Sequence, residues 1–70
     1  MNTEFDSVME DVVTAIRTAG YDPYEQLFGY ISTGKEEYIT RSGGARETIK
    51  KLDRMKVKEY VERMNDGKHV

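Results

Sequence analysis

Asp22-Pro23-Tyr24-Glu25 is the sharpest local signal in the sequence, and it predicts the start of a helix. Aspartate is a favoured N-cap residue, because its carboxylate accepts a hydrogen bond from a free backbone amide of the first turn. Proline suits the first helical position, where its missing amide proton has no helical partner, and Glu25 can reach back to the Asp22 amide. We therefore expect a helix that begins at Pro23 and ends at Gly34, since glycine readily adopts the left-handed stop conformation.

Gly29 lies inside this predicted helix and weakens it by about 1 kcal/mol relative to alanine. A glycine at such a position indicates a close approach, and we expect a neighbouring backbone or an aromatic ring to pass over it. The helix is expected to bury the apolar residues Leu27, Phe28 and Ile31.

An earlier helix is predicted by a single apolar stripe at helical spacing, formed by Val8, Val12, Val13 and Ile16. Asp6 or Ser7 can cap its start, and Gly20 can end it. Residues 1–5, which precede this helix, are expected to form a short flexible tail.

A connector is expected between Lys35 and Gly44, in which Tyr38 and Ile39 form either one short helical turn or an extended plug on the core. The flexible stretch Ser42-Gly43-Gly44 ends the connector, and Ser42 is the expected N-cap of the helical region that follows.

The region from Ala45 to about Met64 is predicted to be helical, but its apolar positions do not share one face. On a helical wheel the apolar residues before position 53 and those after position 56 point in directions that differ by roughly 100°. Either the helix breaks near residues 53–56 or each half faces a different partner. We expect the second half to form a homodimer seam through Met55, Val57, Tyr60, Val61 and Met64, followed by a frayed C-terminus over residues 65–70.

Length and composition restrict the function classes. A 70-residue chain without cysteine, and with His69 as its one histidine, excludes disulfides, zinc knuckles, thiol catalysis and His-based triads. No Ser–His, Lys–Tyr or phosphate-loop pattern is present, so we expect no catalytic residue, no metal and no cofactor. Because so short a chain is marginal as a monomer, self-association is the remaining route to stability.

The predicted fold is all-α: a single domain over residues 1–70, built as a homodimeric, helix-turn-helix-like bundle of three to five short helices. The longest nearly apolar run, residues 27–31, is far shorter than the roughly 20 residues of a membrane span. The acidic N-terminus lacks the pattern of a signal peptide. We therefore expect a cytoplasmic protein without a membrane partner.

Charge is unevenly divided along the chain. The formal net charge is −2, but residues 1–40 carry two basic and eight acidic residues, whereas residues 41–70 carry nine basic and five acidic ones. This asymmetry can steer the C-terminal half toward an anionic partner or toward the N-terminal half of another copy. The residues expected to contact an anion or a partner are Arg41, Ser42, Arg46, Lys50 and Arg54.

Three of these residues, Arg46, Lys50 and Arg54, repeat at a spacing that places them on one face of a continuous helix. Such a face is typical of the recognition helix of a helix-turn-helix protein, and equally of an ordinary solvated surface. The chain is acidic overall and that face has no asparagine or glutamine to read bases. We therefore favour a solvated or protein-contacting face and keep a nucleic-acid-binding module as the alternative.

A set of short motifs follows in order along the chain: Gly20-Tyr21-Asp22-Pro23, Gln26-Leu27, Gly29-Tyr30-Ile31, Gly34, Tyr38-Ile39, Arg41, Ala45-Arg46 and Ile49-Lys50-Lys51-Leu52-Asp53-Arg54. With these motifs, residues 8–64 resemble the IreB regulatory phosphoproteins of Gram-positive bacteria. It implies a small helical homodimer that is not an enzyme. It also implies that the protein is a target of a transmembrane Ser/Thr protein kinase in cell-envelope stress signalling. The phosphorylated protein would in turn act on a further protein downstream.

Two positions follow from the resemblance. The acceptor threonines of the family precede the first helix, and Thr3 is the only threonine in that region of this chain, so the resemblance implies Thr3 as the phospho-acceptor. The family has an aspartate after the position of Arg54 that can cap a new helix. This chain has Met55 there, and Asp53 is the residue that can cap instead.

Overall fold

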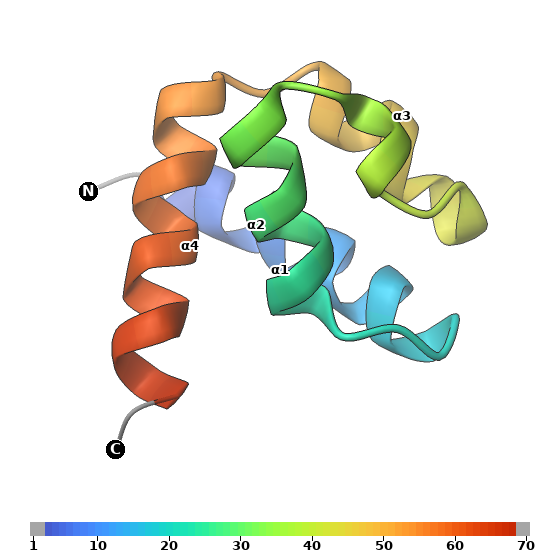
Figure 1. The fold of residues 1–70 in the computed structure, drawn as a ribbon, viewed down its shortest axis with the longest axis horizontal. Helices are drawn as coiled ribbons and strands as arrows, with labels where there is room; N and C mark the ends of the chain where they lie inside the picture. Colours follow the sequence, from blue (N-terminus) through green and yellow to red (C-terminus); the bar gives the residue numbers. More distant parts are fainter. Residues whose placement is uncertain (1–2, 69–70) are drawn as a thin grey trace.

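The computed structural model describes residues 3–68, with side chains described for residues 4–64, and this range folds as a small bundle of helices (Figure 1). No strand occurs within the described range, so the all-α prediction is confirmed. The elements in chain order are α1 (Thr3–Thr18), α2 (Pro23–Thr33), the 3-10 turns η1 (Glu36–Tyr38) and η2 (Ser42–Gly44), α3 (Ala45–Lys50) and α4 (Arg54–Lys68).

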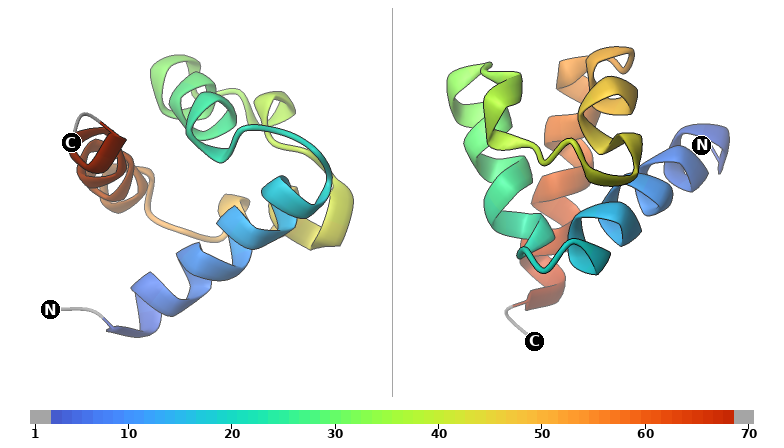
Figure 2. Two further views of the ribbon diagram at one scale, coloured as in Figure 1. Left: turned by 90° about the horizontal axis from the view of Figure 1, so that it is seen from below. Right: turned by 90° about the vertical axis from the view of Figure 1, so that its right-hand side faces the viewer.

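The helices α2 and α4 lie side by side and run in opposite directions, and α1 crosses behind both of them (Figures 1 and 2). The short helix α3 and the turns η1 and η2 close the remaining side, where α3 and η2 pack on α1 and η1 packs on α2. One cluster of buried side chains joins all four helices; its largest fully buried members are Met9, Val12, Ile16, Leu27, Ile39, Ile49, Val57 and Val61.

Helix α2 begins and ends where the sequence predicts. The Asp22 carboxylate accepts a hydrogen bond from the Tyr24 amide at 2.9 Å, and Pro23 is the first helical residue. At the other end Gly34 has a φ of 75°, and its amide donates to the Tyr30 carbonyl at 2.7 Å. The predicted N-cap and the predicted glycine stop are therefore both confirmed. Each of them depends on only a few neighbouring residues, which is why the sequence alone could predict it.

The close approach over Gly29 is also confirmed, and the group that approaches is an aromatic ring. A Cβ placed on Gly29 would come within 2.6 Å of Cδ1 of Tyr38, so even alanine would force the ring or the backbone to shift. The connector forms the 3-10 turn η1, and Ile39 directly after it is fully buried. The two conformations expected for the connector therefore both occur, a helical turn first and a plug on the core immediately afterwards.

Helix α1 begins at Thr3, earlier than the sequence predicts, so Asp6 and Ser7 lie inside the helix and do not cap it. The reason is packing, because Phe5 is buried and extends the apolar stripe by another turn toward the N-terminus. The predicted stop at Gly20 is confirmed, since α1 ends at Thr18 and Gly20 has a φ of 95°.

The predicted break between α3 and α4 is present, but it lies at residues 51–53, slightly earlier than expected. The Asp53 carboxylate accepts a hydrogen bond from the Met55 amide at 2.9 Å and so caps α4. Helix α4 continues to Lys68, past the predicted end near residue 64, and positions 69–70 of the predicted frayed tail lie outside the described residues.

The position of α4 corrects the expected dimer seam. Val57 and Val61 are 0% and 1% exposed, inside the core of a single chain, so they are unavailable to a second copy. Tyr60 and Met64 pack at the edge of the same core, and Met55 is 64% exposed. The turn at residues 51–53 changes the direction of the chain, and the apolar face of α4 therefore packs against α2. A helical wheel drawn for one continuous helix cannot show this change of direction.

Candidate functional site

The structure brings together three of the five residues expected to contact an anion or a partner. Arg41, Arg46 and Lys50 line a surface hollow of about 430 Å³, and two acidic residues, Glu36 and Glu47, line it with them. The hollow forms where η1 approaches the exposed side of α3. Its charge is therefore mixed rather than basic.

Arg46 uses its guanidinium to hold the connector. Its Nε donates a hydrogen bond to the Ile39 carbonyl at 2.9 Å, and its Nη2 donates to the Glu37 carbonyl at 3.4 Å. The Arg46 amide also donates to the Thr40 carbonyl at 3.1 Å. These contacts fix the chain around the buried Ile39, so they give Arg46 a role in the fold itself.

Lys50 is paired with acidic side chains of its own chain. Its Nζ lies 3.4 Å from Oε1 of Glu36 and 3.8 Å from Oε2 of Glu47. These side chains are partly exposed, so each pair adds little to stability, but together they offset the positive charge of Lys50. A surface that neutralises its bases in this way differs from the unpaired basic stripe of a nucleic-acid-binding helix.

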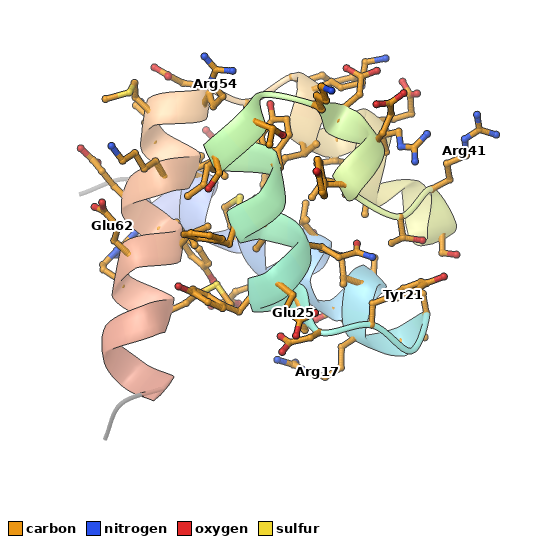
Figure 3. The ribbon with its side chains drawn as sticks, viewed as in Figure 1. Arg17, Tyr21, Glu25, Arg41, Arg54 and Glu62 are labelled. Carbon is orange, nitrogen blue, oxygen red and sulfur yellow. The ribbon has the colours of Figure 1, made fainter. Side chains whose placement is uncertain are left out.

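Arg54 and Ser42 lie apart from this hollow. The break at residues 51–53 places Arg54 on α4, far from Arg41 (Figure 3), and its guanidinium contacts Gly34 at the end of α2. The expectation that Arg46, Lys50 and Arg54 share one helical face is therefore wrong. The expected N-cap is also wrong, because Ser42 lies in η2 and the residue that precedes α3 is Gly44, with a φ of 74°.

A groove between α2 and α4 is the main feature that sequence reasoning missed. It has a volume of about 660 Å³, and its lining residues are Tyr24, Phe28, Ile31, Ser32, Lys58, Val61 and Glu62. The rings of Tyr24 and Phe28 stack with their centroids 5.9 Å apart. Phe28 is 50% exposed, so the expectation that α2 buries it with Leu27 is wrong. The sequence did contain a signal that both residues could not be buried equally. Leu27 and Phe28 are adjacent, and the side chains of neighbouring residues in a helix point about 100° apart.

A second cluster ties the first turns of α1 to α4. The rings of Phe5 and Tyr60 meet edge to face at 6.4 Å, and the Arg63 guanidinium lies 5.3 Å from the centre of the Tyr60 ring. Nη2 of Arg63 also lies 3.4 Å from Oδ1 of Asp6. Burial raises the pKa of Tyr60 above its ordinary value of 10.0, the carboxylates of Glu10 and Asp6 raise it further, and Arg63 opposes them.

Thr3, the position that the family resemblance implies as phospho-acceptor, is the first residue of α1. The acidic residues Glu4 and Asp6 follow it in the first turn. The side chain of Thr3 itself, like that of His69, lies outside the described part of the chain.

The described range also contains no helix that is both long enough and apolar enough to span a membrane. Its notable surface features are a mixed-charge hollow beside α3 and an apolar groove between α2 and α4. Fold and surface together define a small all-α protein with a mixed-charge hollow and an apolar groove on its surface.

The family of the chain is shown by its sequence as a whole. The model of the family described as IreB regulatory phosphoprotein matches residues 1–64, which is nearly all of the chain. The chain belongs to this family, and the family description assigns it a regulatory role. The resemblance stated on the motifs between Gly20 and Arg54 is thereby confirmed.

Proposed function

We propose that this chain is a non-enzymatic regulator that acts through protein–protein contacts and is controlled by phosphorylation. The family match over residues 1–64 is the observation that carries the proposal, because the family is one of regulatory phosphoproteins. In this proposal the chain is a cytoplasmic target of a transmembrane Ser/Thr kinase, and it passes a cell-envelope stress signal to a further protein.

Thr3 is the proposed phospho-acceptor. A phosphate would add about two negative charges next to the first turn of α1, where the helix dipole favours a negative charge. Glu4 and Asp6 already occupy that turn and repel added charge, so we expect a modest gain of order at the start of α1 rather than a change of fold.

Kinase treatment followed by intact-mass and peptide mass spectrometry tests this assignment. We expect one phosphate on the parent chain and none on the Thr3→Ala variant when the Ser/Thr kinase domain of the same organism is used. Thr14→Ala is the matched control, since Thr14 is an exposed threonine of the same helix, and this variant should be phosphorylated like the parent. Phosphate found only at Thr40 or Thr48 would refute the proposal.

The proposal includes a homodimer, since a chain of this length is expected to be marginally stable as a monomer. Of the residues expected at the seam, Met55 is the one whose side chain is mostly exposed. Light scattering of the purified chain should give about twice the monomer mass of 8.1 kDa. A mass of one chain at all concentrations would refute self-association while leaving the phosphorylation proposal intact.

A further inference from the structure

We propose that the groove between α2 and α4 receives an amphipathic helix of a partner protein, with acidic residues at the carboxyl end of that helix. This inference rests on the proposed function, because it requires the chain to act by contact with another protein. It adds the surface that makes the contact and the chemistry of the segment that is recognised.

The walls of the groove suit apolar side chains on a short helix. Tyr24, Phe28 and Ile31 are spaced so that they follow one side of α2 over two turns, a length of about 11 Å. Val61 contributes from α4. A volume of about 660 Å³ holds a few apolar side chains. Recognition of a helix in a groove uses anchors that repeat at this same spacing.

The end of the groove nearest the start of α4 is basic. Lys58 lines the groove, and Arg54 precedes it by one turn of the same helix, beside Gly34 at the end of α2. Neither base forms an ion pair with a described acidic side chain, in contrast to Lys50 and Arg63. The first turn of α4 has no acidic residue. Lys58 therefore presents a positive charge inside this end of the groove, and Arg54 adds a second one just beyond the lining residues.

The charge changes sign along the groove. Glu62 lines it one turn after Lys58, and in Figure 3 Arg54 lies at the start of α4 whereas Glu62 lies further along that helix. The carboxyl end of a docked helix carries a partial negative charge and the amino end a partial positive charge. Both the side chains and the helix dipole thus favour a partner helix that runs antiparallel to α4, with its carboxyl end near Arg54.

Within the described residues, a second copy of this chain offers no free helix that is both apolar on one face and acidic. The acidic helix of the chain is α1, and its apolar residues Phe5, Met9 and Ile16 are already buried within the chain. Releasing α1 would expose the core that holds the bundle together. The charge pattern therefore points to a different protein as the occupant of the groove.

Binding of synthetic helices to the full-length chain, labelled with nitrogen-15, tests the proposal. The probe is a capped peptide of about 15 residues with leucines on one face and glutamates in its last two turns. A second peptide has lysines in place of the glutamates, and a third scatters the leucines around the helix. We expect binding of the first peptide only, weakening with salt, with amide shifts confined to residues 24–32 and 54–62.

Two variants and a matched control locate the contact. Phe28→Ser replaces a half-exposed ring and should weaken binding by about tenfold or more. Lys58→Glu should weaken it by roughly fivefold, with the difference disappearing at high salt. Lys51→Glu makes the same charge change in the turn before α4, at a residue that lines a separate hollow, and should alter binding by less than about twofold. Circular dichroism establishes that each variant is folded.

Three outcomes would overturn the inference. The first is equally tight binding of the lysine peptide, and the second is a set of amide shifts away from the groove. The third is a Phe28→Ser variant that converts a dimer into a monomer in light scattering, because the groove would then be filled by a second copy. The kinase assay on Thr3 is independent of all three outcomes, so failure of the groove proposal is distinguishable from failure of the proposed function.

Discussion

The ring of Tyr38 lies against the backbone of Gly29, so close that a Cβ at position 29 would come within 2.6 Å of the ring carbon Cδ1. This contact docks the connector turn η1 on the middle of α2. Ile39, the residue after Tyr38, is fully buried in the core. A helix-weakening glycine is therefore kept at the point where the connector must approach the helix backbone.

The first prediction is that Gly29→Ala destabilises the chain although alanine is the better helix former. The gain in helix propensity is about 1 kcal/mol, but displacing the base of the Tyr38 ring costs about 2 kcal/mol, as overpacking usually does. Denaturant unfolding should therefore show a net loss of about 1 kcal/mol.

The control for this prediction is the same substitution in a Tyr38→Ala background. Without the ring, Gly29→Ala should stabilise the chain by about 0.5–1 kcal/mol, which reverses the sign of the effect. A stabilising Gly29→Ala with Tyr38 in place would show that the ring moves aside freely, and the proposed reason for the glycine would then be wrong.

The second prediction concerns the cap that starts α4. The Asp53 carboxylate accepts a hydrogen bond from the Met55 amide, so Asp53→Ala should lower the free energy of unfolding by about 1 kcal/mol. Asp53→Asn keeps an acceptor oxygen in the same place and should lose only a few tenths of a kcal/mol. Equal losses in the two variants, measured by denaturant unfolding, would contradict a role for the cap.

The features that sequence analysis predicted correctly are those set by a few neighbouring residues. The cap at Asp22 and the stops at Gly20 and Gly34 depend on the conformational preferences of single residues. The break before α4 is visible because an apolar stripe that changes direction cannot belong to one straight helix. The tight contact over Gly29 is inferred from the same kind of local conflict.

The features that were missed depend on where helices lie in space. Leu27 and Phe28 are adjacent and both apolar, and only the position of α4 decides that Leu27 is buried while Phe28 lines a groove. The burial of Val57 depends in the same way on the direction in which the turn at residues 51–53 sends the chain. Periodicity gives the faces of each helix but not the partner of each face.

The third prediction separates Arg46 from Lys50, which look alike in the sequence. Arg46 donates hydrogen bonds to two connector carbonyls, so Arg46→Ala should destabilise the chain by about 1–2 kcal/mol. Lys50 has only exposed ion pairs, and Lys50→Ala should cost less than about 0.5 kcal/mol. Thermal unfolding of the two variants checks the contrast. Equal effects would show that the connector does not depend on the Arg46 guanidinium.

The fourth prediction is that the chain does not bind duplex DNA. Arg46 and Lys50 are engaged within the chain, and Arg54 lies on a different helix from both of them. A mobility-shift assay at about 50 mM salt, where phosphate contacts are strong, should show no retained complex. Retention that weakens steeply with salt and is lost in an Arg41→Ala variant would instead support a nucleic-acid interface.

The last prediction uses the ionisation of Tyr60, whose pKa is raised above 10.0 by burial and by the carboxylates of Glu10 and Asp6. The unfolded chain therefore loses this proton first as the pH rises. The stabilising contribution is complete below about pH 10 and decreases above it. Tyr60→Phe should remove this part of the pH dependence of unfolding, and Glu10→Gln should reduce it by lowering the pKa of Tyr60. An unchanged pH profile in Tyr60→Phe would show that the tyrosine ionises alike in both states.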